Sequence, residues 1–214
     1  MPRKFLISLA PLLMVVAMGV MPSVSQAAFH WYSNGKRLAF GGAHVAVTTQ
    51  SAPAGLSLVT PTNTINCAVN DTGHVWNPAN EGAGKDEINT FTNSGCVATP
   101  AICPVGTTLE LIATELPWPT HLAAGPRIVI EKIEIDIRCS GTVVATFRGT
   151  LSVAFHNGTT GSAAGCTATP TDSFAEFDTE SGTLEDAEGT KATATGKDCI
   201  WGPSGDEVIT VKNP

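Results

Sequence analysis

Two neighbouring runs of alternating residues decide the fold: Arg127-Ile-Val-Ile-Glu-Lys-Ile-Glu-Ile-Asp-Ile-Arg-Cys139 and Val143-Val-Ala-Thr-Phe-Arg-Gly-Thr-Leu-Ser-Val-Ala-Phe155. In both runs an apolar side chain recurs at every second position, which is the period of a strand with one buried face. The first run changes phase between Ile130 and Ile133, so we expect a β-bulge or tight turn at Glu131-Lys132. The connection between the two runs is short enough to predict a hairpin.

The sequence beyond the N-terminal segment shows further strand patterns and almost no helical periodicity. Asn34-Gly35 favours a type I′ turn, which predicts a hairpin formed by residues 30–33 and 36–40. The segments 70–86 and 156–172 are poor in large apolar residues, and we expect loops there. The other expected strands are residues 43–49, 55–59, 62–69, 87–93, 107–114, 173–177, 182–185, 191–195 and 207–212.

Many short strands separated by Gly, Pro, Asn and Asp predict an all-β fold, either an antiparallel β-sandwich or a partly closed barrel. A parallel α/β fold is disfavoured because no crossover helices are predicted. The length suits one domain, and no linker-like change in composition divides the chain. We therefore expect a single β domain at residues 28–214.

The first 27 residues have the three parts of a secretory signal peptide. Arg3 and Lys4 precede an apolar run, and Ser25-Gln-Ala27 supplies the small residues of a cleavage site. Polar, proline and glycine residues interrupt the apolar run, which makes it too short for a membrane anchor, and no later stretch is long enough to span a bilayer. We expect cleavage after Ala27 and a secreted, extracytoplasmic product with no transmembrane segment.

The charge of the chain argues against a polyanionic partner. Twelve Lys and Arg residues stand against nineteen Asp and Glu residues, which gives a formal net charge of −7. Nucleic-acid binding relies on a concentration of basic side chains, and the sequence shows none. We therefore expect an acidic protein that does not bind nucleic acid.

All six cysteines lie beyond the expected signal peptide, and an even number in an exported chain predicts three disulfides. Structural zinc sites place their nearest thiolates roughly two to four residues apart, and the closest pair here is wider. The sequence does not select one pairing. A short loop bounded by prolines favours Cys96–Cys103, and two strand ends favour Cys67–Cys139, which leaves Cys166–Cys199.

Aromatic and histidine residues provide the candidate ligand contacts. His74 and Trp76 follow Asp71 closely, so these side chains could form a small polar pocket with an aromatic wall, although single histidines are usually surface residues. Trp118 lies between prolines in Leu116-Pro-Trp-Pro119, which hold the segment extended. Its indole then either plugs an open end of the β structure, which is the favoured interpretation, or contacts a ligand.

A stretch of carboxylates at residues 172–189 raises two chemical possibilities. A glycosidase needs two carboxylates of unequal pKa, and the range Glu176–Glu188 contains several acids, but their alternation with Phe177 favours a solvated strand face. Calcium is the one metal that the segment suggests, although the spacing matches no EF-hand loop. No other cofactor is indicated, and no histidine has metal-ligand spacing. The calcium candidates are Asp178, Glu180, Glu185, Asp186 and Glu188.

Five short motifs resemble a group of exported bacterial β-rich proteins of unknown activity. The resemblance covers most of residues 28–214 and implies an exported β fold, but it implies no activity. Cys166 and Cys199 fall outside its pattern. The motifs are His30-Trp-Tyr-Ser-Asn-Gly-Lys-Arg-Leu38, Ile65-Asn-Cys67, Leu116-Pro-Trp118, Ile137-Arg-Cys139 and Ser181-Gly-Thr-Leu184.

These observations favour a non-enzymatic secreted binding module or surface-associated module. One alternative is a secreted hydrolase with an acidic active site in the range Glu176–Glu188. Another is a structural envelope component whose strand edges pair with a second chain. The ligand, the oligomeric state and the role of segment 172–189 remain open at this level.

Export processing provides a first test. If residues 1–27 are removed, the secreted protein begins at Ala28, and the loss of Arg3 and Lys4 makes it more acidic than the full chain. Mass spectrometry of the secreted protein without reduction measures both the N-terminus and the number of free thiols. A product that keeps Met1 would contradict the signal-peptide assignment, and free thiols would contradict complete disulfide formation.

Overall fold

The computed structural model describes residues 28–162 and 165–213. Within these residues the chain forms strands and no helix. The strands are β1 (His30–Ser33), β2 (Lys36–Arg37), β3 (Val45–Val59), β4 (Thr64–Trp76), β5 (Lys85–Thr99), β6 (Leu109–Thr114), β7 (Trp118–Ala123), β8 (Arg127–Cys139), β9 (Thr142–His156), β10 (Phe174–Phe177), β11 (Leu184–Glu185), β12 (Lys191–Trp201) and β13 (Ile209–Lys212).

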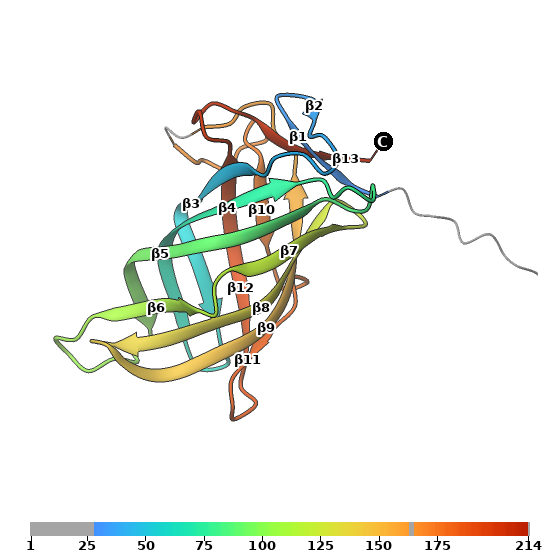
Figure 1. Ribbon diagram of the computed structural model, residues 1–214. Coiled ribbons are helices and arrows are strands. Elements are labelled where there is room, and N and C mark those ends of the chain that lie inside the picture. The colour runs from blue at the N-terminus through green and yellow to red at the C-terminus, as the bar shows by residue number, and fades with distance from the viewer. Residues whose placement is uncertain (1–27, 163–164, 214) are drawn as a thin grey trace, which may run out of the picture.

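Long antiparallel strands close into an eight-strand barrel with extra strands attached (Figure 1). Around the barrel, β12, β3, β4, β5, β7, β8 and β9 follow one another, each antiparallel to the next. The eighth position is shared by β10 and β11, because each pairs with both β9 and β12. The all-β prediction is confirmed, and of the two expected architectures the chain adopts the barrel, in a closed form.

Local breaks in register bend the strands, which helps the sheet to curl. The pairing of β8 with β9 shifts after Ile130, and Lys132 has a φ of 56°. This confirms the bulge predicted at Glu131-Lys132. In β3 the register against β4 shifts between Gln50 and Leu56. Apolar residues on both sides of each bend therefore face the barrel interior.

The interior is apolar along most of its length. Strand β4 shows the alternation most clearly, because its odd-numbered residues, among them Ile65, Cys67, Val69 and Val75, are buried while its even-numbered residues are more exposed. The predicted hairpin of β8 and β9 is confirmed and supplies much of the remaining core. Its contributions are Ile128, Ile130, Ile133, Ile135, Ile137, Phe147, Leu151, Val153 and Phe155.

A three-stranded sheet of β13, β1 and β2 lies at one end of the barrel (Figure 1). Asn34 and Gly35 have φ values of 47° and 75°, as a type I′ turn requires, so the predicted hairpin is confirmed although β2 is shorter than expected. The Trp31 side chain is fully buried and packs edge-on against Phe155, with ring centroids 5.5 Å apart. Trp31 closes this end of the barrel.

Asparagine side chains join this cap to the barrel. Asn77 is fully buried; its Oδ1 accepts the Trp31 N–H at 2.9 Å, and its Nδ2 donates to the carbonyls of Trp31 at 3.1 Å and Leu38 at 2.9 Å. Asn157 exchanges two hydrogen bonds of 2.6 Å with the Val211 backbone in β13. Because an amide side chain carries both a donor group and an acceptor, it can continue a ladder where two strands part.

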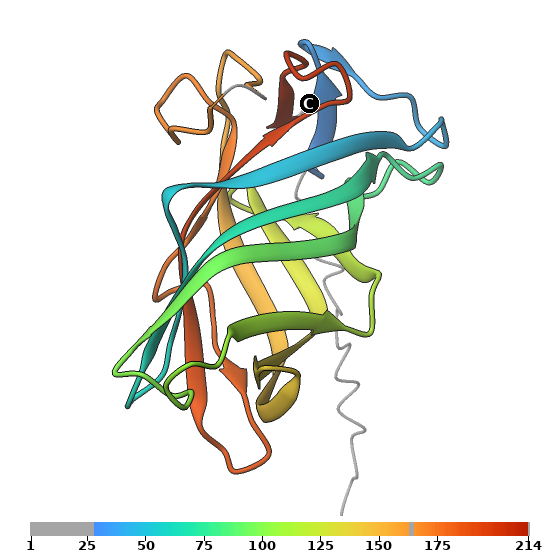
Figure 2. The same cartoon turned by 90° about the vertical axis from the view of Figure 1, so that its left-hand side faces the viewer.

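One seam of the barrel is held by a side chain in place of a backbone ladder. Strand β5 pairs with β7 only from Lys85 to Ile88, and among the described residues no ladder joins the rest of β5 to β6. The Asn93 side chain bridges this seam, because it donates to the Leu111 carbonyl and accepts the Leu111 N–H at 3.4 Å. Figure 2 shows β5 and β6 running at an angle to each other.

Three disulfides are present, and two of the expected pairings are wrong. Cys67 bonds to Cys96 on the adjacent strand, and Cys103 bonds to Cys139. The expected Cys67–Cys139 bond cannot form because β5 and β7 separate β4 from β8. The expected Cys96–Cys103 loop is replaced because β6 returns along β8 and brings the 100–108 connection to Cys139. The third pair, Cys166–Cys199, is as predicted.

Two local predictions are also corrected. Residues 70–76 belong to β4 and residues 85–86 to β5, so most of the expected 70–86 loop is a hairpin of long strands. The proline-flanked Trp118 begins strand β7 and is not an end plug. The expected loop at 156–172 has only isolated bridges in the described part, and Cys166 fastens it over a second cluster with Phe174, Cys199 and Trp201.

In the described part of the chain there is no helix with the length and hydrophobicity needed to cross a membrane.

The bonds of Asn77 lead to a stability prediction. Asn77→Ala leaves the buried Trp31 N–H without its partner and removes one hydrogen bond each from the carbonyls of Leu38 and Trp31, the latter of which keeps the Leu38 N–H. We expect a loss of about 3 kcal/mol or more, and a fall in melting temperature of roughly 6–12 °C for a chain of this size. Thermal unfolding measures this, with Asn80→Ala as the exposed control. Equal melting temperatures for the two variants would contradict the role of Asn77.

Candidate functional site

Three polar side chains face the barrel interior from three adjacent strands. Asp71 lies on β4 in phase with the buried residues of that strand. Thr49 on β3 is its register partner and also pairs with Ile200 of β12. Asp198 lies two residues before Ile200 on the same face of β12, and both acids are more than nine-tenths buried. The closure of the barrel therefore brings two carboxyl groups and one hydroxyl together.

These polar atoms lack the partners that buried groups normally have. Oδ1 of Asp71, Oδ1 of Asp198 and Oγ1 of Thr49 are buried and find no hydrogen-bond partner among the described residues. Most buried polar atoms in proteins are paired, because an unpaired one costs roughly 1–3 kcal/mol. An unpaired cluster facing a cavity is therefore a candidate site.

Burial changes the protonation of both acids. Desolvation raises the pKa of Asp71 well above its usual range, and the neighbouring charge of Asp198 raises it further. Desolvation also raises the pKa of Asp198, to about 7, and the Thr49 hydroxyl opposes part of the rise. Two carboxyl groups in a place of low polarity cannot both ionise easily, so the pair holds at least one proton in the empty barrel below neutral pH.

A third acid extends the polar region toward the cap. Asp86 on β5 is buried, its Oδ1 has no partner in the described residues, and desolvation raises its pKa well above the usual range. Its register partner on β7 is Thr120, whose hydroxyl is likewise buried and unpaired. Asp71, Asp86 and Asp198 all line one cavity.

Two adjoining cavities occupy the interior. The polar one has a volume of about 60 Å³ and is lined by the three acids, Thr49 and apolar side chains such as Val153. The other has a volume of about 80 Å³ and an almost wholly apolar wall. The two share part of their lining, namely Asp71, Ile88, Ile130 and Phe177. The interior is therefore an apolar space with one acidic region.

Trp118 belongs to this interior. Its side chain is 3% exposed, lines the apolar cavity and lies 5.8 Å from the Phe91 ring, centroid to centroid. Its Nε1–H donates to the Thr114 carbonyl at 2.9 Å. Trp118 and Phe91 lie on either side of the β5–β6 seam together with Leu111, the residue that Asn93 holds. The indole lines the cavity beside the part of the wall where β5 and β6 share no backbone ladder among the described residues.

His74 and Trp76 lie on the opposite, outer face of β4, so they do not form a pocket with Asp71. His74 Nδ1 is 2.8 Å from Asn89 Oδ1 and 3.5 Å from Glu87 Oε1. Trp76 stacks on exposed His44, with ring centroids 4.1 Å apart. The expected pocket fails because strand alternation sends Asp71 inward and its even-numbered neighbours outward.

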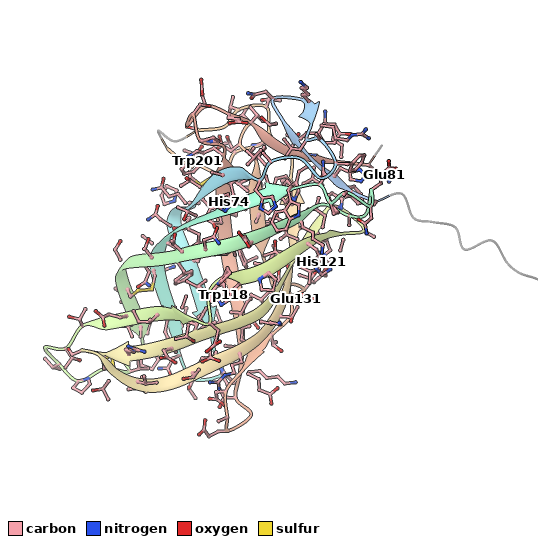
Figure 3. All side chains as sticks on the ribbon, viewed as in Figure 1. His74, Glu81, Trp118, His121, Glu131 and Trp201 are labelled. Atoms are coloured by element: carbon pink, nitrogen blue, oxygen red, sulfur yellow. A yellow bond between two sulfur atoms is a disulfide. The ribbon has the colours of Figure 1, made fainter. Side chains whose placement is uncertain are left out.

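Figure 3 labels His74 on β4 and the His121–Glu131 pair on β7 and β8, with β5 between β4 and β7. A shallow hollow of about 460 Å³ runs beside these residues and includes Trp76. Two of its charged groups, Glu87 and Glu131, pair with His74 and His121 across the strands. Asp86 and Thr120, which also lie in its wall, are the members of this lining that have a buried atom without a partner among the described residues.

The acidic segment 172–189 serves local structure. Asp178 accepts hydrogen bonds from the Glu180 N–H and the Ser181 hydroxyl, and Asp186 accepts two backbone N–H groups in the next turn. Glu176 forms ion pairs with His156 at 2.9 Å and Lys197 at 3.4 Å. Across residues 28–162 and 165–213, no group of three or more His, Cys, Asp or Glu side chains is arranged to hold a metal ion.

The sequence contained a signal for the interior acids that the motif analysis missed. Asp71 falls in phase with Ile65, Cys67, Val69 and Val75, so the alternation that identifies the strand also predicts an inward carboxyl. For Asp198 the strand prediction ended at residue 195, before the acid was reached. Only the register of β12 against β3 shows that the two acids are neighbours.

Comparisons of the chain with protein-family models, with curated proteins and with solved structures found no match.

The raised pKa of Asp198 leads to a prediction of pH-dependent stability. In the unfolded chain this acid ionises at about pH 4, whereas in the folded chain its pKa is about 7. Between these values only the unfolded state gains from ionisation, so the contribution of Asp198 to folding stability is present below pH 4 and is lost as the pH rises to 7. Asn cannot ionise and therefore does not lose stability in this way.

We expect the melting temperature of Asp198→Asn to be closest to that of the unchanged protein near pH 4. Between pH 4 and pH 8 the variant should become progressively more stable than the unchanged protein. Melting temperatures across this range measure the difference. Glu188→Gln, at an exposed position between β11 and β12, is the control and should show no such trend. A difference between Asp198→Asn and the unchanged protein that stays constant from pH 4 to 8 would refute the protonation of this acid.

Proposed function

We propose that the chain is an extracytoplasmic, non-enzymatic binding protein whose barrel interior takes up one small, largely apolar molecule. The observation that carries this proposal is the pair of adjoining cavities, in which a mostly apolar wall meets a few convergent polar atoms. Ligand sites in proteins have this composition: apolar surface supplies affinity, and a small number of polar groups fix orientation.

The size of the cavities limits the ligand. Their volumes are about 80 and 60 Å³, far below the several hundred Å³ of sites for drug-sized molecules. Engineered apolar cavities of about 150 Å³ accept benzene, which is close to the two interior spaces taken together. The ligand is therefore a molecule with a single ring or a short aliphatic chain.

Access through the side of the barrel fits this proposal better than access through its ends. Trp31 covers one end, and at the other a hollow of about 260 Å³ has the buried side chains of Ile65, Ile137 and Phe147 in its wall. The β5–β6 seam depends on the Asn93 side chain and lies directly outside the apolar cavity. Opening this seam breaks the two hydrogen bonds between Asn93 and Leu111 and does not break a backbone ladder.

The proposed compartment rests on two features. Three disulfides are typical of proteins that fold in an oxidising environment. The signal-peptide pattern supports the same location, although residues 1–27 lie outside the described part of the chain.

The two alternatives from the sequence have less support. In segment 172–189, Asp178 and Asp186 bind backbone groups and Glu176 pairs with Lys197, so a hydrolase would rather use Asp71 and Asp198, in a space with little room for both water and a substrate. An envelope component would need open strand edges. Strand β2, at the edge of the cap, carries Lys36 and Arg37, and such charges discourage edge-to-edge pairing.

Toluene tests interior binding because its size fits the cavities and it has no polar group. We expect NMR titration to shift the Trp118 indole N–H and the Leu111 backbone signals, while the His44 and Trp76 signals stay constant. Ala194→Leu fills the apolar cavity and should abolish the shifts. Ala46→Leu, on the outer face of β3, adds the same atoms and should leave them unchanged. Toluene shifts confined to outer-surface residues, or equal shifts in both variants, would overturn the proposal.

A further inference from the structure

The interior cluster has more acceptor oxygens than donor hydrogens, because its donors are limited to the Thr49 hydroxyl and the proton that the acid pair retains. Asp71 Oδ1, Asp198 Oδ1 and Thr49 Oγ1 lie on adjacent strands, and all three are buried without a partner among the described residues. Asp86 adds a fourth unpaired oxygen to the same cavity wall. The described side chains that line the two cavities include no Lys, Arg or His. The protein therefore supplies no positive charge to balance these acids.

A protonated primary amine has the complementary chemistry. An ammonium group carries three N–H donors, one positive charge and no acceptor. Hydrogen bonds between an ammonium and a carboxylate are stronger than neutral ones, and they gain further strength in a place of low polarity. A neutral alcohol offers only one donor hydrogen, and its oxygen adds one more acceptor to a cluster that is already rich in acceptors.

We infer that the ligand of the proposed interior site is a small primary amine, whose ammonium group binds Asp71, Asp198 and Thr49 while its apolar part lies against Ile130 and Phe177. This inference rests on the proposed binding function and adds the chemical class of the ligand. The shared wall of the two cavities places the apolar part next to the acids, so one short molecule reaches both. The amine replaces the proton that the empty pair retains.

Three probes of the same shape test the inference: toluene, benzyl alcohol and benzylamine. At pH 8 we expect benzylamine to bind at least about tenfold more tightly than benzyl alcohol, as charged hydrogen bonds in a buried site allow. NMR titration of the interior signals measures all three affinities on the full-length secreted protein. Benzylamine stays protonated across the accessible pH range, as the lysine side chain does.

Variants then locate the selectivity. Asp198→Asn removes one charge and adds N–H donors. Because a charged hydrogen bond is lost, the preference for benzylamine over benzyl alcohol should fall to roughly threefold or less. Thr49→Val, which keeps the side-chain shape, should reduce the preference for benzylamine partly. Glu188→Gln changes an exposed carboxylate between β11 and β12 and should leave this preference intact. Melting temperatures confirm that each variant is folded.

Lowering the pH supplies an independent readout. Protons compete with the amine for the acids, so we expect benzylamine affinity to fall from pH 8 to pH 5 while toluene affinity stays constant. The titratable groups that line this part of the barrel are Asp71, Asp86, Glu87 and Asp198. In Asp198→Asn the fall should be smaller.

The outcomes separate this inference from the function on which it rests. If toluene binds inside but benzylamine binds no better than benzyl alcohol, the amine inference is wrong and the binding function stands. If a benzylamine preference survives unchanged in Asp198→Asn, the assigned acids are wrong. If none of the three probes shifts the interior signals, both the binding function and the amine inference fail.

Discussion

A closed barrel gives each of its long strands a face that does not meet water, and every polar group on that face then needs a partner from within the protein. Most of the molecule follows from this constraint. The inward positions of β4, β8 and β9 are almost all apolar, and bulges such as the one at Lys132 keep them in phase where strands bend. The polar groups that do lie inside fall into two sets: amide side chains that are hydrogen-bonded to the backbone, and carboxyl groups that have an unpaired oxygen.

Asparagine side chains supply hydrogen-bond partners for buried backbone groups. Asn77 and Asn157 tie β1 and β13 to the barrel, and Asn93 ties β6 to β5. In each case a side-chain amide satisfies backbone groups at a place where strands separate. The arrangement also creates an asymmetry, because the cap is held by several bonds around a buried Trp31, whereas the β5–β6 seam depends on a single side chain next to a cavity.

The interior acids depart from the constraint that the closed barrel imposes. Asp71, Asp86 and Asp198 each have one buried oxygen without a partner among the described residues, and desolvation raises the pKa of each. A hydrophobic residue at any of these positions would satisfy the barrel better. The acids therefore lower the stability of the folded protein near neutral pH.

Much of the fold could be predicted from local patterns. The alternation in residues 127–155 predicted the central hairpin and its bulge, and Asn34-Gly35 predicted the first turn, because both signals depend on neighbouring residues alone. The disulfide partners were less accessible. Cys67 and Cys139 both follow apolar alternation, but sequence does not say that two other strands lie between them.

The candidate site divides in the same way. The amino-acid sequence by itself determined that the chain forms strands, since strand geometry alternates side chains at every second position, and that it contains an even set of cysteines, but it placed Asp71 in an expected loop. Only the tertiary structure decided that Asp198 joins Asp71, that Trp118 faces inward, and that His74 and Trp76 face outward. Those relations depend on which strands become neighbours when the sheet closes, and closure is a property of the whole chain.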